Sequence, residues 1–152
     1  MHHSIHTLAT ALLLSLAGLS ACSKDTATPT TASTPEQLLV GQWQQTTSTN
    51  GMTGRTSPAD PAQRLKLVFT AAGQLTMLLN GTVVNTTPYS LVKRQSMLTQ
   101  QLETYLVTDP GNTQVLQTVR VDANTLVLAI DAYDGPSATY QRRILGSNSL
   151  YW

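Results

Sequence analysis

The chain has 152 residues, yet it contains one cysteine, three histidines and one phenylalanine. All of the histidines, His2, His3 and His6, lie near the N-terminus, and the cysteine is Cys22. Downstream of Cys22 there is therefore no material for a Ser-His-Asp triad, a cysteine nucleophile, an imidazole or thiolate zinc site, or a disulfide. We expect no enzymatic activity, no cofactor and no metal site, and only a pair of carboxylates in a cleft would change that expectation.

Charge is also scarce, because charged residues make up 11% of the chain and nine basic residues nearly balance eight acidic ones. No basic patch with interleaved aromatic residues is present, so we expect no nucleic-acid partner. The segment DAYDG at residues 131–135 holds two carboxylates, but it lacks the alternating spacing of a calcium-binding loop. This segment is predicted to be a solvated turn.

A long hydrophobic run is missing as well. The uncharged segment Leu8–Leu19 is rich in leucine and alanine, but a membrane-spanning helix needs about 20 apolar residues. The apolar core of a cleavable signal peptide needs only about 7 to 15 residues, which this segment matches. The run leads directly into Leu19-Ser20-Ala21-Cys22.

This tetrapeptide resembles the lipobox of bacterial lipoproteins. The resemblance implies that residues 1–21 are a lipoprotein signal peptide and that Cys22 becomes an acylated N-terminus, so the first expected partner is a membrane. Two or three acyl chains, at about 0.8 kcal/mol per buried methylene, make a firm anchor. Ser23 stands where an aspartate would retain some lipoproteins at the inner membrane. We therefore expect a location in the cell envelope, with the outer membrane favoured over the inner membrane.

Residues 22–36 follow the signal and consist largely of threonine, serine, alanine and proline. Such a segment has too little apolar content to fold, so it is predicted to be a flexible tether. A chain of this length would hold the next domain on the order of 20 Å from the bilayer. Residues 37–152 are enough for one domain with one core.

Alternation of apolar and polar residues recurs along this domain. Leu65, Leu67 and Phe69 share one face of a predicted strand, and a second strand is predicted over residues 74–79. Asn80-Gly81 follows, which favours a type I′ hairpin turn. Residues 64–92 are therefore predicted to form a three-stranded antiparallel meander.

Further strands are predicted over residues 38–46, 102–108, 113–121, 126–130 and 138–145. About eight antiparallel strands joined by short turns favour an all-β fold, an up-and-down β-barrel, with a β-sandwich as the alternative. Residues 48–63 exceed the usual loop length. They are interpreted either as a lid over the open end of the barrel or as an unstructured decoration.

The segments GQW (Gly41–Trp43), LKLVFTAAGQLTM, and VRVDANTLVLAI followed by ATYQRR occur in this order. Together they resemble the lipocalin-like domains of small bacterial lipoproteins, over roughly residues 37–145. The resemblance implies that Trp43 closes the floor of the barrel. It also implies that Arg142 or Arg143 packs over the indole in a cation–π contact.

The resemblance further implies a membrane-anchored envelope protein that binds a small apolar ligand or a lipid. Residues expected to face the interior, and hence the ligand, are Leu67, Phe69, Met77, Leu79, Tyr105, Leu128 and Tyr140. Side chains alone can fill an eight-stranded barrel. The alternative is therefore a filled core and a non-enzymatic interaction module that binds an envelope protein or a glycan through its loops.

Overall fold

The computed structural model describes residues 33–108 and 116–143. Cys22, the expected signal peptide and most of the expected tether lie outside the described residues. The same holds for residues 113–115 and 144–145 of the predicted strands.

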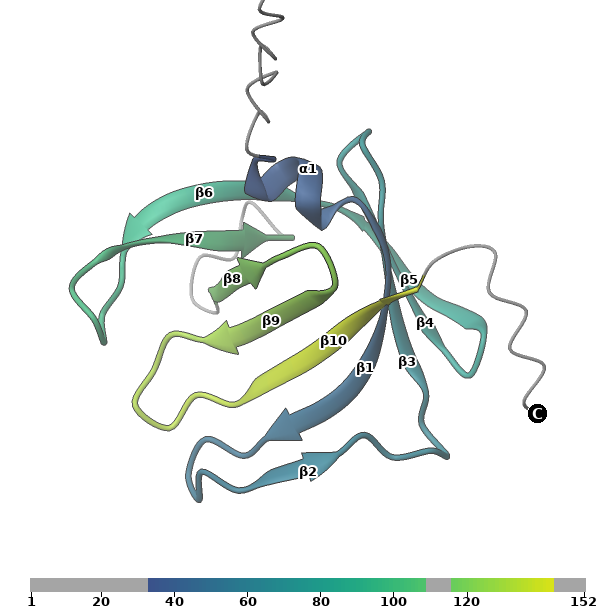
Figure 1. Cartoon of the computed structure of the whole chain (residues 1–152), viewed down its shortest axis with the longest axis horizontal. Helices are drawn as coiled ribbons and strands as arrows, with labels where there is room; N and C mark the ends of the chain where they lie inside the picture. The colour runs from purple at the N-terminus through teal and green to yellow at the C-terminus, as the bar shows by residue number, and fades with distance from the viewer. Residues whose placement is uncertain (1–32, 109–115, 144–152) are drawn as a thin grey trace, which may run out of the picture. The chain divides into compact units, whose positions relative to one another are not determined.

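One short helix and ten strands make up the described part of the chain (Figure 1). The helix is α1 (Pro35–Leu39). The strands are β1 (Gly41–Thr49), β2 (Thr56–Pro58), β3 (Leu65–Phe69), β4 (Gln74–Leu79), β5 (Thr82–Pro88), β6 (Ser90–Gln95), β7 (Leu102–Val107), β8 (Gln117–Val121), β9 (Thr125–Ile130) and β10 (Ser137–Arg143).

Helix α1 replaces the beginning of the first predicted strand, which is wrong at Leu38. Thr34 is the N-cap, and its hydroxyl accepts a hydrogen bond from the Gln37 amide at 3.4 Å. The Gln37 side chain in turn accepts a bond from the Thr34 amide at 3.1 Å. This reciprocal capping box, with Pro35 in the first turn, stabilises a helix of only five residues. The sequence TPEQ carries this signal, and the last residues of the expected tether belong to it.

The strands form one antiparallel sheet in the order β5-β4-β3-β1-β10-β9-β8-β7-β6, and β2 pairs with the end of β1. β1 joins the two halves of the sheet, because it pairs with β3 on one side and with β10 on the other. Figure 1 shows the sheet curling around the space beneath α1. The expected all-β antiparallel fold with a barrel-like curl is confirmed.

The two ends of this path, β5 and β6, are separated in sequence by Tyr89 alone. The run from Thr82 to Gln95 is therefore one bent segment, whose first half pairs with β4 and whose second half pairs with β7. The Tyr89 ring packs edge-on against Phe69 at 5.1 Å between centroids, and its hydroxyl donates to the Thr70 carbonyl at 3.0 Å. If β5 and β6 are counted as one bent strand and β2 is treated as an addition to β1, the sheet has eight strands.

The hairpin predicted at Asn80-Gly81 is confirmed, since both residues adopt positive φ, at 52° and 83°. The prediction of one long loop over residues 48–63 is wrong. β1 continues to Thr49, and residues 56–58 pair with residues 47–49 across a turn closed by Asn50. Both strands are rich in polar threonines here, so no alternation of apolar and polar residues indicated this pairing.

The buried core lies on the concave face of the sheet. Its members are Leu39, Trp43, Leu67, Phe69, Leu75, Leu106, Val119, Leu126, Leu128 and Tyr140. They come from α1 and from seven of the strands that follow it, so the short helix packs onto the same core as the sheet.

Candidate functional site

The end of the domain beneath α1 is closed by Trp43, whose side chain is completely buried. Its indole Nε1 donates a hydrogen bond to the Leu39 carbonyl at 2.8 Å. The guanidinium carbon of Arg142 lies 4.2 Å from the ring centroid, which is a cation–π contact. We call α1, Trp43 and Arg142 the sealed end.

Arg142 also binds the carbonyl groups that the end of α1 leaves without helical partners. Its Nη1 donates to the Val40 carbonyl at 2.8 Å, and its Nη2 donates to the Leu38 carbonyl. Its Nε donates to the Ala123 carbonyl in the β8–β9 turn at 2.6 Å. One side chain therefore satisfies the C-terminal end of the helix and ties it to a turn distant in sequence.

Gly41 is required by this arrangement. Its φ is +140°, and a Cβ atom at this position would collide with the Arg142 guanidinium. Arg143, the second expected partner of the indole, is exposed and stands opposite Gln42. Gly41, Trp43 and Arg142 thus form one structural unit, and Arg142 is the arginine that stacks on the indole.

Burial along the concave face decreases with distance from the sealed end. On β3 and β4, Phe69 and Leu75 are opposite each other and buried, whereas Leu65 and Leu79 are opposite each other and only half-buried. Between these pairs, Leu67 is buried and Met77 is half-buried. The apolar surface of these strands is therefore left partly open.

The same decrease occurs on β9 and β10. Leu126 and Tyr140 are buried opposite each other, while Ala138 and Ile130 are half-buried. Burial raises the pKa of Tyr140 to about 12, so its hydroxyl stays neutral at physiological pH. Of the expected interior residues, Leu67, Phe69, Leu128 and Tyr140 contribute to the packed core, whereas Met77 and Leu79 retain exposed surface.

Tyr105 is buried but does not belong to this core. It stands opposite Thr118, on the face of the sheet away from Val119, and its hydroxyl donates to Asp131 Oδ2 at 2.6 Å. Asp131 Oδ1 accepts a bond from the Ser96 hydroxyl at 2.8 Å, and Oδ2 accepts one from the Met97 amide at 2.8 Å. These bonds fasten the β6–β7 turn to the β9–β10 loop.

The electrostatics of this network favour an ionised carboxylate. Burial alone would raise the pKa of Asp131, but the hydrogen bonds from Tyr105, Met97 and Ser96 outweigh it and hold the pKa below its ordinary value. Burial, and then the bond to Asp131, raises the pKa of Tyr105. The predicted turn at residues 131–135 is present, and Tyr133 and Asp134 are exposed in it. Asp131 differs from the prediction, because it is half-buried and bonded to Ser96, Met97 and Tyr105.

Three turns meet at the side of the domain that carries this network. The β1–β2 turn touches the β9–β10 loop, since a Cβ atom on Gly51 would collide with the backbone of Asp134 and Gly135. The β6–β7 turn is fastened to the same loop through Asp131. We call these three turns the loop end, which lies at the left and lower left of Figure 1.

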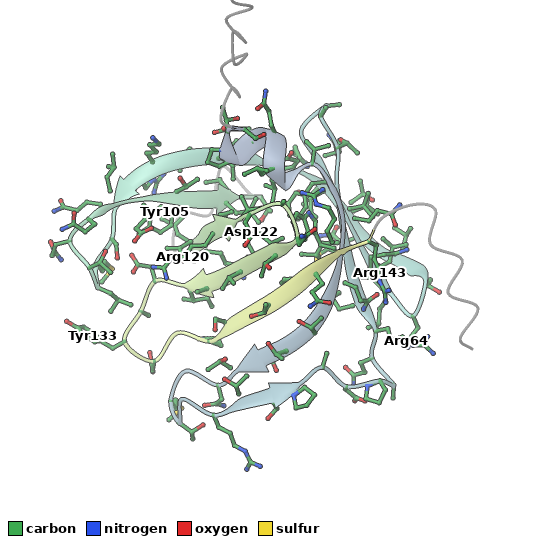
Figure 2. All side chains as sticks on the ribbon, in the orientation of Figure 1. Arg64, Tyr105, Arg120, Asp122, Tyr133 and Arg143 are labelled. Carbon is green, nitrogen blue, oxygen red and sulfur yellow. The ribbon has the colours of Figure 1, made fainter. Side chains whose placement is uncertain are left out.

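The loop end carries most of the large apolar side chains that the described residues expose. These are Met52, Met97, Leu98, Leu102 and Tyr133, and Val83 and Val84 on β5 are the others. Tyr133 is 92% exposed, and Figure 2 shows it projecting from the tip of its loop. Scattered exposed apolar residues are normal on a protein surface, whereas these five lie on or beside adjoining turns.

Three pockets lined by described residues have volumes of about 650, 350 and 120 Å³. The largest is lined by Gln44, Pro61, Ala62, Arg64, Lys66, Asn80 and Gly81. The other two adjoin Asp131. Of the expected ligand-binding residues, only Tyr105 lines one of these three pockets. The residues of the 650 Å³ pocket were not predicted as a site, although Arg64 and Lys66, two residues apart on a predicted strand, were a visible signal in the sequence.

No group of three or more histidine, cysteine, aspartate or glutamate side chains that could hold a metal ion is found in residues 33–108 and 116–143. Within the same ranges, no helix is both long and apolar enough to cross a membrane.

Comparisons with known protein families, with curated proteins and with solved structures return no match for this chain.

Proposed function

We propose that the domain is a non-enzymatic binding domain with a lipocalin-like barrel that takes up a small, mostly apolar molecule or a lipid. The ligand would lie on the open part of the concave face, against Met77 and Leu79, and would be reached from the loop end. The observation that carries this proposal is the decrease in burial from Phe69 to Leu79 on one continuous apolar face.

Two features support a ligand at this position. Met77 packs against the buried core but is itself only half-buried, so an apolar molecule would remove further apolar surface from water at about 25 cal/mol per Å². The exposed apolar side chains of the loop end, among them Met52 and Tyr133, offer a second contact where a bulky ligand would protrude. The deeply buried residues Leu67, Phe69, Leu128 and Tyr140 would support the site rather than touch the ligand.

The lipobox at Leu19–Cys22 supports the proposal that this domain is anchored in the cell envelope through an acylated Cys22, with the outer membrane favoured. An anchored binding protein keeps its ligand close to a bilayer. This part of the proposal is tested separately, by labelling with a radioactive fatty acid in cells. The wild-type chain should carry the label and Cys22→Ala should not, and an unlabelled wild-type chain would contradict the anchor.

A second candidate function is favoured by the packing of the sealed end. Trp43, Phe69 and Leu126 are buried there, which favours a filled core over a deep ligand site. In that case the exposed apolar residues of the loop end would contact an envelope protein or a glycan, and the domain would be an interaction module.

Native mass spectrometry of the full chain, extracted from its own envelope in mild detergent, distinguishes the two candidates. A matched pair of variants on β4 sharpens the result. Leu79→Gln changes the concave face and Leu78→Gln changes the opposite face, and both side chains are half-buried in the wild type.

We expect a discrete additional mass on the wild-type protein and on Leu78→Gln, and its loss from Leu79→Gln. An unliganded mass for all three proteins, together with no uptake of added lipid, would reject the small-molecule proposal. That result would leave the interaction module as the function.

A further inference from the structure

The largest pocket lies on a different surface from the proposed apolar site. Trp43 and Leu67 point into the core, so alternation along β1 and β3 puts their neighbours Gln44 and Lys66 on the outer face. Arg64, labelled in Figure 2, directly precedes β3 and shares this face. We call this space of about 650 Å³ the cationic pocket.

Hydrogen bonds hold the walls of the cationic pocket in place. Two hydrogen bonds join Arg64 and Asn80, each at 3.0 Å. The backbone amide of Arg64 donates to Asn80 Oδ1, and the backbone amide of Asn80 donates to the Arg64 carbonyl. Asn80 Nδ2 donates to the Ala62 carbonyl at 2.9 Å, and Gln44 Nε2 donates to the Leu65 carbonyl at 2.9 Å. A site that is already ordered loses little conformational entropy when a ligand binds.

The charge in the pocket is not balanced by the described residues. The ion pair found among them joins Arg120 and Glu103, at 3.5 Å, and involves neither Arg64 nor Lys66. Asp60 is close in sequence, but it does not line the pocket, and its Oδ1 accepts a bond from the Ala62 amide at 2.8 Å. Two neighbouring cations on one face repel each other, and an anion between them would remove that repulsion.

We propose that the cationic pocket binds a phosphate monoester. Such a group carries about 1.5 to 2 negative charges at pH 7, which matches the combined charge of Arg64 and Lys66. The arginine offers a planar pair of donors to two phosphate oxygens, and the lysine supplies a point charge. The pocket exceeds the size of a phosphate alone, so it has room for a substituent such as glycerol or a sugar.

Titration calorimetry on the full chain in a neutral detergent at low ionic strength tests this proposal, with glycerol 3-phosphate as the probe. We expect Arg64→Gln and Lys66→Gln each to weaken binding about tenfold, as loss of one charged hydrogen bond does, and the double variant to abolish it. Arg55→Gln is the matched control, because Arg55 is an exposed arginine of the β1–β2 turn that does not line the pocket.

Three results would overturn the proposal. They are no heat of binding with the wild-type chain, undiminished binding by the double variant, and equal weakening by Arg55→Gln. Thermal unfolding of each variant controls for loss of the fold, and these exposed or half-buried substitutions should change the unfolding temperature little.

A phosphate monoester could be a soluble metabolite or the headgroup of a lipid, and two further probes distinguish these sources. Dihexanoyl phosphatidic acid carries the monoester on a lipid, whereas dihexanoyl phosphatidylglycerol carries only a diester. Tighter binding of the former than of glycerol 3-phosphate indicates a headgroup, and weaker binding indicates a soluble ligand. Equal binding of the diester lipid would contradict recognition of a monoester. Leu79→Gln lies on the concave face and should leave the affinity for glycerol 3-phosphate unchanged, so this proposal can fail independently of the apolar site. The two lipid probes are compared in the Leu79→Gln variant, where the proposed apolar site is weakened.

Discussion

The sealed end and the loop end of this domain use their apolar and polar groups in opposite ways. At the sealed end, Trp43 is fully buried, and Arg142 satisfies carbonyl groups from both α1 and the β8–β9 turn. At the loop end, large apolar side chains such as Met52 and Tyr133 are left in water. Stability is therefore concentrated at one end of the sheet, and surface available for binding is concentrated at the other.

Because the sealed end is a structural unit, its Gly-x-Trp sequence and its arginine give information about architecture and none about a ligand. The proposed ligand contacts lie elsewhere in the domain. They are Met77, Leu79 and the exposed apolar residues of the loop end. We therefore expect substitutions at the sealed end to lower the stability of the fold and substitutions at the loop end to weaken binding.

The largest loss of stability is expected for Trp43→Ala. This change leaves a cavity at a fully buried position and removes the partner of both the Leu39 carbonyl and the Arg142 guanidinium. We expect a loss of about 3 to 5 kcal/mol in the free energy of unfolding. Urea denaturation followed by far-ultraviolet circular dichroism measures it. A loss below about 1 kcal/mol would mean that the sealed end does not hold the fold together.

A smaller loss is expected for Arg142→Gln, with Arg143→Gln as its matched control. The first change leaves carbonyl groups near α1 without donors and removes the cation over Trp43, which should cost about 2 to 3 kcal/mol. Arg143 is exposed, so its replacement should change the free energy of unfolding by less than about 0.5 kcal/mol. Equal losses from the two variants would contradict the assignment of Arg142 to the sealed end.

Asp131 fastens two turns of the loop end, and its contribution should depend on pH. Its pKa is lowered in the folded state, so the network stabilises the fold above about pH 4, the range of an unfolded aspartate, and loses this stabilisation as the pH falls through the lower folded value. We expect Asp131→Asn to cost about 1 to 2 kcal/mol at pH 7.

The same variant should flatten the decrease in stability at acid pH. Urea denaturation of wild type and Asp131→Asn between neutral pH and about pH 2.5 measures both effects. Parallel pH profiles would show that Asp131 does not contribute through its charge. Tyr105→Phe keeps the carboxylate but removes one of its donors, so it should reduce the difference between the folded and unfolded pKa values without abolishing it.

The smallest effect on stability is expected for Met52→Ser and Tyr133→Ser. Both side chains are exposed, so the free energy of unfolding should change by less than about 0.5 kcal/mol. Binding of a bulky apolar ligand should nevertheless weaken. Denaturation and lipid uptake, measured on the same samples, test the two halves of this prediction. A large loss of stability would show that these side chains serve the fold.

The sequence was most informative where the hydrophobic pattern was regular. Leu65, Leu67 and Phe69 alternate with polar or less buried residues on β3, and Asn80-Gly81 marks the next hairpin, so this region could be predicted closely. The alternation of side chains along β10 could also have distinguished Arg142 from Arg143. Residues 140 and 142 share one face of a strand, so Arg142 lies on the same face as the buried Tyr140.

Other features depend on contacts that no local pattern records. Helix α1 is too short for an apolar stripe, and only the capping box of Thr34 and Gln37 signals it. β2 has no buried residue, and it is recognised only because it pairs with β1. The partners of Asp131 lie far away in sequence, so the network could be found only in three dimensions.

NMR of the methionine methyl groups, recorded while lipids from the native envelope are added, tests directly whether the concave face binds a ligand. Outside the expected signal peptide, the chain has Met52, Met77 and Met97, which lie on the β1–β2 turn, the concave face and the β6–β7 turn. We expect a saturable shift of the Met77 resonance, accompanied by smaller shifts of the other two. If Met52 or Met97 responds while Met77 does not, or if none responds, the concave face is not a ligand site.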